Sequence, residues 1–294
     1  ARLPPLDRHG KCHAGKWDPL YSLESKVPLS EFDIIGFTLP YETLYTNVLN
    51  ALDLAGIPLH NNERGENDPI IIAGGHATYN PEPMAPFIDA FVIGEGEEVI
   101  HEIVDSIQDS RASDRNRNEA IAALSAVKGV YLPSFYQPKY NGDGTFSNLE
   151  PITKEFPTKI VKRICAPLPP PPTHFLVPSI DVVHDRIPIE IMRGCTRGCR
   201  FCHAGMVNRP VRERSLEEIV NSLDTALGNT GYEEIALLSL SSSDYTHISE
   251  LIHLVTTRFA GRNLAISLPS LRIESFSIDL MEKLKGVRQG GFTL

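Results

Sequence analysis

The chain has 294 residues, of which 41% are hydrophobic, values that suit a globular protein with room for two domains. Its net charge of −9 gives no sign of the basic surface typical of nucleic-acid-binding proteins, so we expect no clear nucleic-acid surface. No apolar run approaches the roughly 18 residues of a membrane span and no signal peptide opens the chain, so we expect a soluble, cytoplasmic protein that does not enter a membrane.

The N-terminal part is predicted to form a layered α/β domain. Residues 1–30 show little periodicity and are expected to be irregular, whereas apolar strands alternate with amphipathic helices over residues 31–129. The strands are expected at 32–39, 69–73 and 90–93, and the helices from about 41, over 99–107 and over 118–127. This alternation predicts a flavodoxin-like, doubly wound parallel sheet with both faces covered.

Glycine-rich turns follow the second and third of these strands. They contain Gly74, Gly75 and His76 in one turn, and Gly94 and Glu95 in the other. Ligands of doubly wound sheets bind beyond the carboxyl ends of the strands, and residues without side chains let a large ligand approach the backbone. We therefore expect a ligand site at this edge of the sheet.

A connector is expected over residues 130–178. Two short strands around a tight turn are predicted at 130–140 and 145–152, and a proline-rich run at 167–172 is expected to be extended and stiff. This run is the predicted domain boundary. A polyproline recognition ligand is the alternative interpretation.

Strands and helices alternate again over residues 179–294. The strands are predicted at 187–192, 234–240 and 263–268, the helices from Ser215, over 246–259 and over 277–285, with a fourth strand opening at Phe292. This order is that of the first half of a (β/α) barrel. We interpret the chain as a fragment of a longer protein, truncated after the start of the fourth barrel strand.

Three of the five cysteines fall within eight residues. Cys195, Cys199 and Cys202 are spaced C-x3-C-x2-C on the predicted loop between a strand and a helix, where α/β barrels place their chemistry. Three thiolates without an evident fourth ligand are an incomplete set for a structural zinc ion or a ferredoxin-type cluster. A [4Fe–4S] cubane held at three irons leaves one iron open to a ligand that is not protein. The alternative is a zinc site completed by His203 or a distant residue.

The motif, with Phe201 before its last cysteine, and its flanks EIMRGCTRGCRFCHAGM resemble the radical S-adenosylmethionine (SAM) superfamily, in the branch fused to an N-terminal cobalamin-binding-type domain. The resemblance implies that the three cysteines hold a [4Fe–4S] cluster and that SAM binds the open iron. It also implies reductive cleavage of SAM to a 5′-deoxyadenosyl radical, with an electron donor of the flavodoxin or ferredoxin type. The SAM-binding residues would be Phe201, Ser239, Ser241, Ser242, Asp244, Ser267 and Arg272.

The chain departs from the superfamily after the second barrel strand. A Gly-Gly-Glu element commonly binds the SAM amino group there, whereas this chain has serines and Asp244. Hydroxyls and a carboxylate can accept hydrogen bonds from an ammonium group. The alternative is that these residues cap the next helix. For Arg272, a salt bridge to the SAM carboxylate and a surface salt bridge within the protein are both open.

The resemblance also covers the N-terminal sheet, where GGHATYNPEP and IGEGEE are similar to loops of cobalamin-binding domains. The residues implied to line the nucleotide side of cobalamin are Thr38, Gly74, Gly75, His76, Gly94 and Glu95. The Asp-x-His-x-x-Gly motif that ligates cobalt is matched only in part, by residues 7–10, which follow prolines rather than a strand. Cobalamin binding therefore stays open, against a vestigial fold that serves as a platform for substrate or assembly.

These features predict a radical SAM enzyme with a [4Fe–4S] cluster, SAM and an unknown substrate, with cobalamin-dependent methylation as one reaction. One alternative is an RNA-modifying or methylthiotransferase-type radical SAM enzyme without cobalamin. The other is a non-catalytic zinc-binding module. Since specificity in barrel enzymes resides in the loops and later strands, the sequence does not identify the substrate, and a half barrel can bind a cluster and still be inactive.

Overall fold

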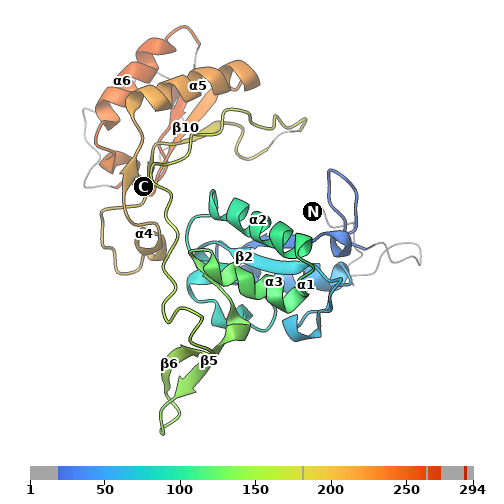
Figure 1. The fold of residues 1–294 in the computed structure, drawn as a ribbon. Coiled ribbons are helices and arrows are strands. Elements are labelled where there is room, and N and C mark those ends of the chain that lie inside the picture. The colour runs from blue at the N-terminus through green and yellow to red at the C-terminus, as the bar shows by residue number, and fades with distance from the viewer. Residues whose placement is uncertain (1–18, 181, 263, 273–287, 290–294) are drawn as a thin grey trace. The chain divides into compact units, whose positions relative to one another are not determined.

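The structure, a computed structural model, describes residues 19–180, 182–262, 264–272 and 288–289 (Figure 1). The chain divides into two compact units, Ala1–Cys165 and Ala166–Leu294. None of the helices in the described ranges is both long and apolar enough to cross a membrane.

The first unit contains a four-stranded sheet in the order β1-β2-β3-β4. The strands β1 (Ile34–Thr38), β2 (Ile70–Gly74) and β3 (Ala90–Val92) run parallel. The helices are α1 (Tyr45–Leu54), α2 (Val99–Ala112) and α3 (Arg117–Ala123). The short 3-10 helices are η1 (Leu29–Glu31), η2 (Glu42–Leu44), η3 (Asn61–Glu63), η4 (His76–Tyr79), η5 (Glu82–Met84), η6 (Leu124–Ala126) and η7 (Pro133–Phe135).

Side chains on β2 alternate between two cores, one on each face of the sheet. Ile71 packs with Val48 and Leu52 of α1, whereas Ile70 and Ile72 pack with the helices α2 and α3. Successive residues of a strand point to opposite faces, so an all-apolar strand needs a helix layer on both sides. The predicted doubly wound α/β layer is confirmed.

The edge next to β3 differs from the prediction. The expected strand at 130–140 is two strands: β4 (Val130–Tyr131) joins the sheet antiparallel to β3, and β5 (Tyr136–Tyr140) pairs with β6 (Phe146–Pro151) in a hairpin. Two helices, α2 and α3, lie between β3 and β4, so this connection is not the single-helix crossover typical of a parallel pair. The sheet is therefore mixed rather than purely parallel.

A returning segment, residues 163–165, completes this side of the first unit. Arg163 forms a parallel bridge with Gly94, and its backbone N–H donates to the carbonyl of Ile93 at 2.9 Å. The Arg163 guanidinium bonds Glu98 at 2.7 Å and Glu102 of α2 at 2.6 Å. The returning segment thus ties the end of the connector to both β3 and α2.

The second unit contains four parallel strands in the order β12-β11-β10-β7. These are β7 (Ile187–Glu190), β10 (Glu234–Leu238), β11 (Ala265–Ser267) and β12 (Arg288–Gln289). The other elements are β8 (Met192–Arg193), α4 (His203–Val207), β9 (Arg212–Glu213), α5 (Leu216–Thr230), η8 (Ser242–Asp244) and α6 (Ile248–Arg258). The described strands form an open sheet, in the strand–helix order predicted for the first half of a barrel.

One face of this sheet packs against α5 and α6. Ile187 and Ile189 of β7 and Ile235 of β10 lie in one core with residues of both helices. Ser215 caps α5 by accepting from the backbone N–H of Glu218, so this helix begins where the sequence predicted. The predicted helix at 277–285 and the strand predicted to open at Phe292 lie outside the described residues.

Candidate functional site

The loop that carries the three cysteines is closed at its base by a short antiparallel ladder. Met192 and Arg193 of β8 pair with Glu213 and Arg212 of β9. Gly194 follows with a φ of 88°, and a Cβ there would lie 2.7 Å from the carbonyl oxygen of Asn208. Only glycine fits this close approach without displacing the other end of the loop. The cysteine loop, residues 194–211, therefore begins and ends at one point beside the end of β7.

Each of the three sulfurs accepts a hydrogen bond from a nitrogen. Cys195 Sγ accepts from the backbone N–H of Arg197 at 3.4 Å, and Cys202 Sγ from that of Gly205 at 3.3 Å. Cys199 Sγ accepts from Arg272 Nη1 at 3.4 Å. Such donors stabilise a thiolate over a thiol, and the thiolate is the form that binds metal.

The three sulfurs are not arranged as ligands of a single zinc ion. In a tetrahedral site with Zn–S bonds of about 2.3 Å, neighbouring sulfurs lie about 3.8 Å apart. Among the described side chains, the one group with ligand atoms all within 4.8 Å of one another does not include Cys195, Cys199 and Cys202. A cubane binds each thiolate at a different iron and needs wider spacing. The predicted ligand role of the three cysteines stays a prediction.

The predicted serine-rich segment lies beyond the end of β10 and is held mainly by its own hydrogen bonds. Ser239 Oγ donates to Ser242 Oγ at 3.2 Å, and Ser241 Oγ donates to Asp244 Oδ2 at 2.7 Å. Ser242 is fully buried, and its Oγ lies 2.7 Å from the carbonyl oxygen of Pro269 and 3.1 Å from that of Leu237. Ser242 therefore ties the ends of β10 and β11 together rather than presenting a free hydroxyl to a ligand.

Asp244 faces the cysteine loop. Arg197 binds both of its carboxylate oxygens, Nε to Oδ2 at 2.9 Å and Nη2 to Oδ1 at 2.5 Å. The hydrogen bonds from Arg197 keep the pKa of Asp244 below its usual range. The alternative role in helix capping is not found: the N-cap of α6 is His247, without a side-chain hydrogen bond.

Of the remaining residues predicted to bind SAM, Arg272 contacts the cysteine loop by its hydrogen bond to Cys199 Sγ. The Phe201 side chain is 91% exposed, within the cysteine motif. Ser267 of β11 is buried, and its Oγ accepts from Arg186 Nη1 at 3.4 Å, beside the Arg186–Glu234 ion pair. Ser267 thus contacts Arg186, which lies outside the cysteine loop.

The predicted ligand edge of the first unit contains a cavity of about 390 Å³. Its lining comes from the ends of β1, β2 and β3 and the start of α2: Gly36, Phe37, Thr38, Ile72, Ala73, Gly74, Gly75, Val92, Gly94, Gly96, Val99 and Ile100. Four of the six residues predicted to contact cobalamin are in this lining, and His76 and Glu95 are not. The volume suits part of a large cofactor, such as a nucleotide, or one small ligand.

Two of the glycines are needed for reasons that the sequence did not reveal. A Cβ on Gly75 would lie 2.6 Å from the carbonyl oxygen of Leu39, and one on Gly94 would lie 2.2 Å from that of Arg163. Both have positive φ angles, 110° and 118°. The interpretation that these small residues admit a cofactor is therefore incomplete, because their close approach is to the protein's own backbone.

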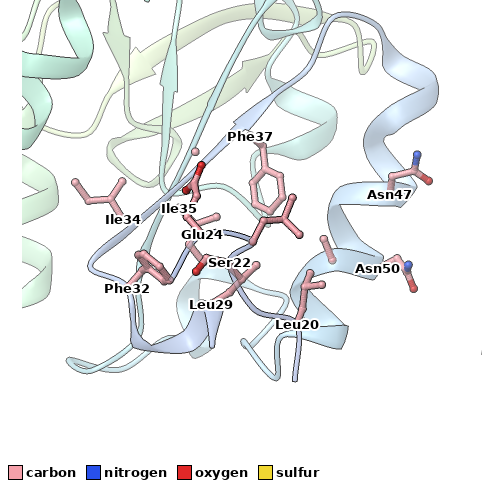
Figure 2. A pocket seen from close by; sticks show the side chains of 13 residues that line it. Leu20, Ser22, Glu24, Leu29, Phe32, Ile34, Ile35, Phe37, Asn47 and Asn50 are labelled. Carbon is pink, nitrogen blue, oxygen red and sulfur yellow. The ribbon is translucent and has the colours of Figure 1, made fainter. Parts of the chain in front are cut away.

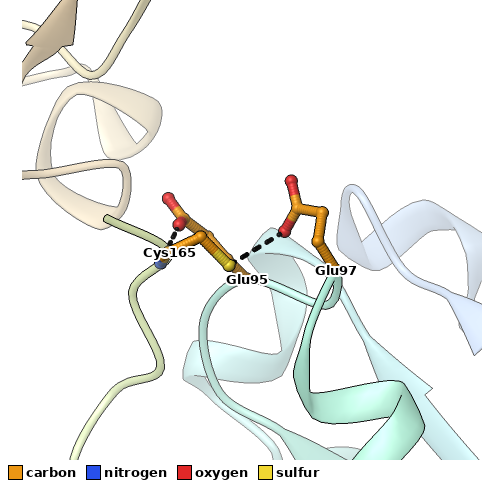
Figure 3. Close-up of side chains that lie close together, drawn as sticks. All are labelled: Glu95, Glu97 and Cys165. Atoms are coloured by element: carbon orange, nitrogen blue, oxygen red, sulfur yellow. Dashed lines mark hydrogen bonds between the residues drawn. The ribbon is translucent and has the colours of Figure 1, made fainter. Parts of the chain in front are cut away.

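Glu95 has its carboxylate beside the returning segment. Its Oε2 accepts from the backbone N–H of Cys165 at 2.6 Å, and Cys165 Sγ donates to Glu97 Oε2 at 3.7 Å (Figure 3). Burial and, to a smaller extent, the nearby carboxylates raise the pKa of the Cys165 thiol. Nothing in the sequence links Cys165 to these glutamates, which lie about seventy positions earlier.

A second cavity, of about 630 Å³, lies along β1 and α1 (Figure 2). Its lining is mostly apolar and includes Leu20, Leu29, Ile35 and Phe37, with Asn47 and Asn50 of α1 at one side. The sequence did not predict this cavity, which is formed by the segment before β1 folding back toward α1.

Two protein-family descriptions match the chain. The one described as radical SAM proteins, N-terminal, matches residues 4–133, and the one described as radical SAM superfamily matches residues 189–293. The chain belongs to the radical SAM superfamily. The predicted membership is confirmed, and the two matches include the cavity-forming sheet edge and the cysteine loop, respectively.

This radical SAM chain is similar to proteins of two other organisms. An uncharacterised protein of Methanocaldococcus jannaschii is 27% identical over 271 residues, which cover 90% of this chain and 50% of that protein. An uncharacterised methyltransferase of Pyrococcus horikoshii is 26% identical over 268 residues, 88% of this chain and 50% of that protein. The chain thus spans about half the length of the curated relatives it matches.

The fold of this radical SAM chain also resembles a solved structure. The radical SAM methyltransferase TsrM of Kitasatospora setae, with cobalamin and a [4Fe–4S] cluster bound, aligns with a TM-score of 0.51. The identity is 12%, and the alignment covers 88% of this chain and 49% of that one. The likeness confirms the predicted fold class, an α/β layer followed by part of a radical SAM barrel.

Proposed function

We propose that the protein is a radical SAM enzyme whose [4Fe–4S] cluster is held by Cys195, Cys199 and Cys202. The observation that carries this proposal is the cysteine loop itself: three sulfurs, each with an N–H donor, on one loop closed at the carboxyl end of β7. Membership of the superfamily supports the assignment of the three thiolates as cluster ligands.

When bound and reduced, such a cluster supplies the electron that cleaves a carbon–sulfur bond of SAM. The residues of the chain would hold the cluster and orient SAM beside it. The donors to the sulfurs, including Arg272, offset the negative charge of the thiolates. Ser241 and Asp244 lie next to the same loop, where Ser241 Oγ and the Arg197 guanidinium donate to the Asp244 carboxylate.

Anaerobic reconstitution tests the proposal. We expect about four iron and four sulfide per chain, with the brown absorption of a [4Fe–4S] cluster. Incubation with SAM and dithionite should then yield 5′-deoxyadenosine. One zinc per chain without sulfide would contradict the proposal and favour a zinc-binding module.

We also propose that the cavity at the ends of β1, β2 and β3 binds the nucleotide portion of cobalamin and that the reaction is a methyl transfer. The cavity lies at the edge where doubly wound sheets bind ligands, and Thr38, Gly74, Gly75 and Gly94 line it. TsrM, whose fold this chain shares, is a methyltransferase with cobalamin bound. If cobalamin does not bind, the alternative function is that of an RNA-modifying or methylthiotransferase-type radical SAM enzyme.

Filling the cavity mouth should weaken cobalamin binding. Thr38 is exposed at the end of β1 and lines the cavity, so Thr38→Trp should raise the dissociation constant for hydroxocobalamin about tenfold or more, measured by absorption titration. Thr153→Trp, an exposed threonine in the connector, is the matched control and should leave the constant unchanged. Equal binding by both variants would place cobalamin elsewhere.

The remaining partners are proposed from the chemistry alone. Cleavage of SAM needs one electron, and we propose a donor of the flavodoxin or ferredoxin type. A cluster with free thiols persists in a reducing compartment, so we propose the cytoplasm as its location. Loss of activity on replacing dithionite with reduced flavodoxin or ferredoxin would count against these donors.

A further inference from the structure

Arg197 makes two contacts within the cysteine loop and one with Asp244, beyond the end of β10. Its backbone N–H donates to Cys195 Sγ at 3.4 Å, and its carbonyl oxygen accepts from Arg209 Nη2 at 3.2 Å. Its guanidinium forms the bidentate pair with Asp244. The position of the first predicted cluster ligand is therefore linked, through one residue, to a carboxylate outside the loop.

Asp244 is oriented for this pairing by hydrogen bonds with Ser241. Ser241 Oγ donates to Oδ2, and the backbone N–H of Asp244 donates to the carbonyl of Ser241 at 3.0 Å. The Asp244 side chain is 11% exposed, whereas that of Arg197 is 44% exposed. The carboxylate is thus the fixed partner, and the arginine is the group held by it.

Two-point hydrogen bonding restricts orientation more than a single contact does. A planar guanidinium that binds both carboxylate oxygens fixes the direction of the arginine side chain. Arg197 lies between Cys195 and Cys199 in the sequence. A fixed orientation of its side chain therefore restricts the conformation of the backbone that joins these two cysteines. Groups of this kind, one step removed from a metal ligand, set the orientation of that ligand.

We propose that Arg197 and Asp244 are positioning residues that hold the cysteine loop in the geometry needed to bind the cluster. Asp244 then acts on the cluster through Arg197, rather than as the acceptor for the SAM amino group that the resemblance implies. This inference rests on the proposed function, since it requires that the loop binds a cluster.

The two roles of Asp244 predict different results for Arg197→Gln and Asp244→Asn. If the pair positions the loop, both variants should lose iron to a chelator about tenfold faster than the unaltered protein does. Replacing a residue that orients a metal ligand typically weakens metal binding about 10- to 100-fold, and we expect the lower value. Both should also shift the electron paramagnetic resonance spectrum of the reduced cluster. The double variant should be no worse than either single one, because both remove one interaction.

If Asp244 binds the SAM amino group instead, the pattern is different. Asp244→Asn would weaken SAM binding, measured by the change that SAM causes in the resonance spectrum, while Arg197→Gln would leave it unaltered. In that case iron loss would be normal in both variants, and the positioning role would be wrong.

Arg200→Gln is the matched control. Arg200 is an exposed arginine in the same loop, two positions before Cys202, so its replacement removes the same charge from that loop. We expect normal iron retention in this variant; a loss equal to that of Arg197→Gln would show a general effect of charge and overturn the proposal. Failure of the unaltered protein to bind iron and sulfide would instead contradict the proposed function.

Discussion

Cys199→Ser should reduce the iron and sulfide content of anaerobically reconstituted protein from about four of each per chain to near zero. A cubane held at three irons has no spare protein ligand, so loss of one thiolate leaves two attachments and a second exposed iron. Of the three proposed ligands, Cys199 is the one to replace first, because it is partly exposed and its sulfur accepts from Arg272. Chemical iron and sulfide analysis and the visible absorption spectrum measure the effect.

Cys165→Ser is the control for this experiment. Cys165 is buried in the first unit and donates to Glu97, and a serine hydroxyl preserves a donor at that place. The control should retain the full complement of iron and sulfide. Full iron content in the Cys199 variant, or equal losses in both variants, would contradict the assignment of the three-cysteine motif as the cluster site.

Asp89→Asn should destabilise the protein by about 3–5 kcal/mol, the usual result of breaking a buried ion pair by removing one partner. One oxygen of Asp89, Oδ2, accepts from Arg64 at 2.9 Å, from Arg117 at 2.8 Å and from the backbone N–H of Ile71 at 2.7 Å. The carboxylate and the Arg64 side chain are nearly inaccessible to solvent. The amide would leave two buried cations without their counter-charge, and a urea titration followed by circular dichroism should show the lower midpoint.

An exposed aspartate provides the comparison for Asp89. Asp33 pairs with Arg111, and both side chains are more than half exposed. Exposed ion pairs contribute about 0–1 kcal/mol, so Asp33→Asn should leave the urea midpoint almost unchanged. Similar midpoints for the Asp33 and Asp89 variants would show that the buried cluster is not a main source of stability in the first unit.

The regular elements were predictable because their signals are local. Apolar runs and glycine-rich turns predicted β1, β2 and β3, and the helical stripe beginning at Val99 predicted α2. The serine before α5 predicted its first residue. The antiparallel direction of β4 was missed because it depends on the two helices between β3 and β4 and on the free edge of β3, which are properties of the fold and not of the residues at 130–131.

The site was predictable in its residue types and less so in their contacts. The spacing of the cysteines shows which loop carries them, but not that Arg197 binds Asp244, 47 positions later. In the same way, Gly94 was expected to make room for a ligand, whereas it makes room for Arg163. Such pairings connect distant parts of the chain through backbone approach and ion pairing, for which a single sequence contains no periodic signal.

The returning segment determines where the first unit can be cut from the rest of the chain. Arg163 and Cys165 lie more than thirty positions beyond β4, yet they bond to Gly94's neighbours, to α2 and to Glu95. A shortened protein that stops at the end of the hairpin would leave the turn after β3 uncovered and Glu95 without its backbone donor. One that stops after Cys165 keeps these bonds, so autonomous folding of the α/β layer should require a tail that contributes no strand to its sheet.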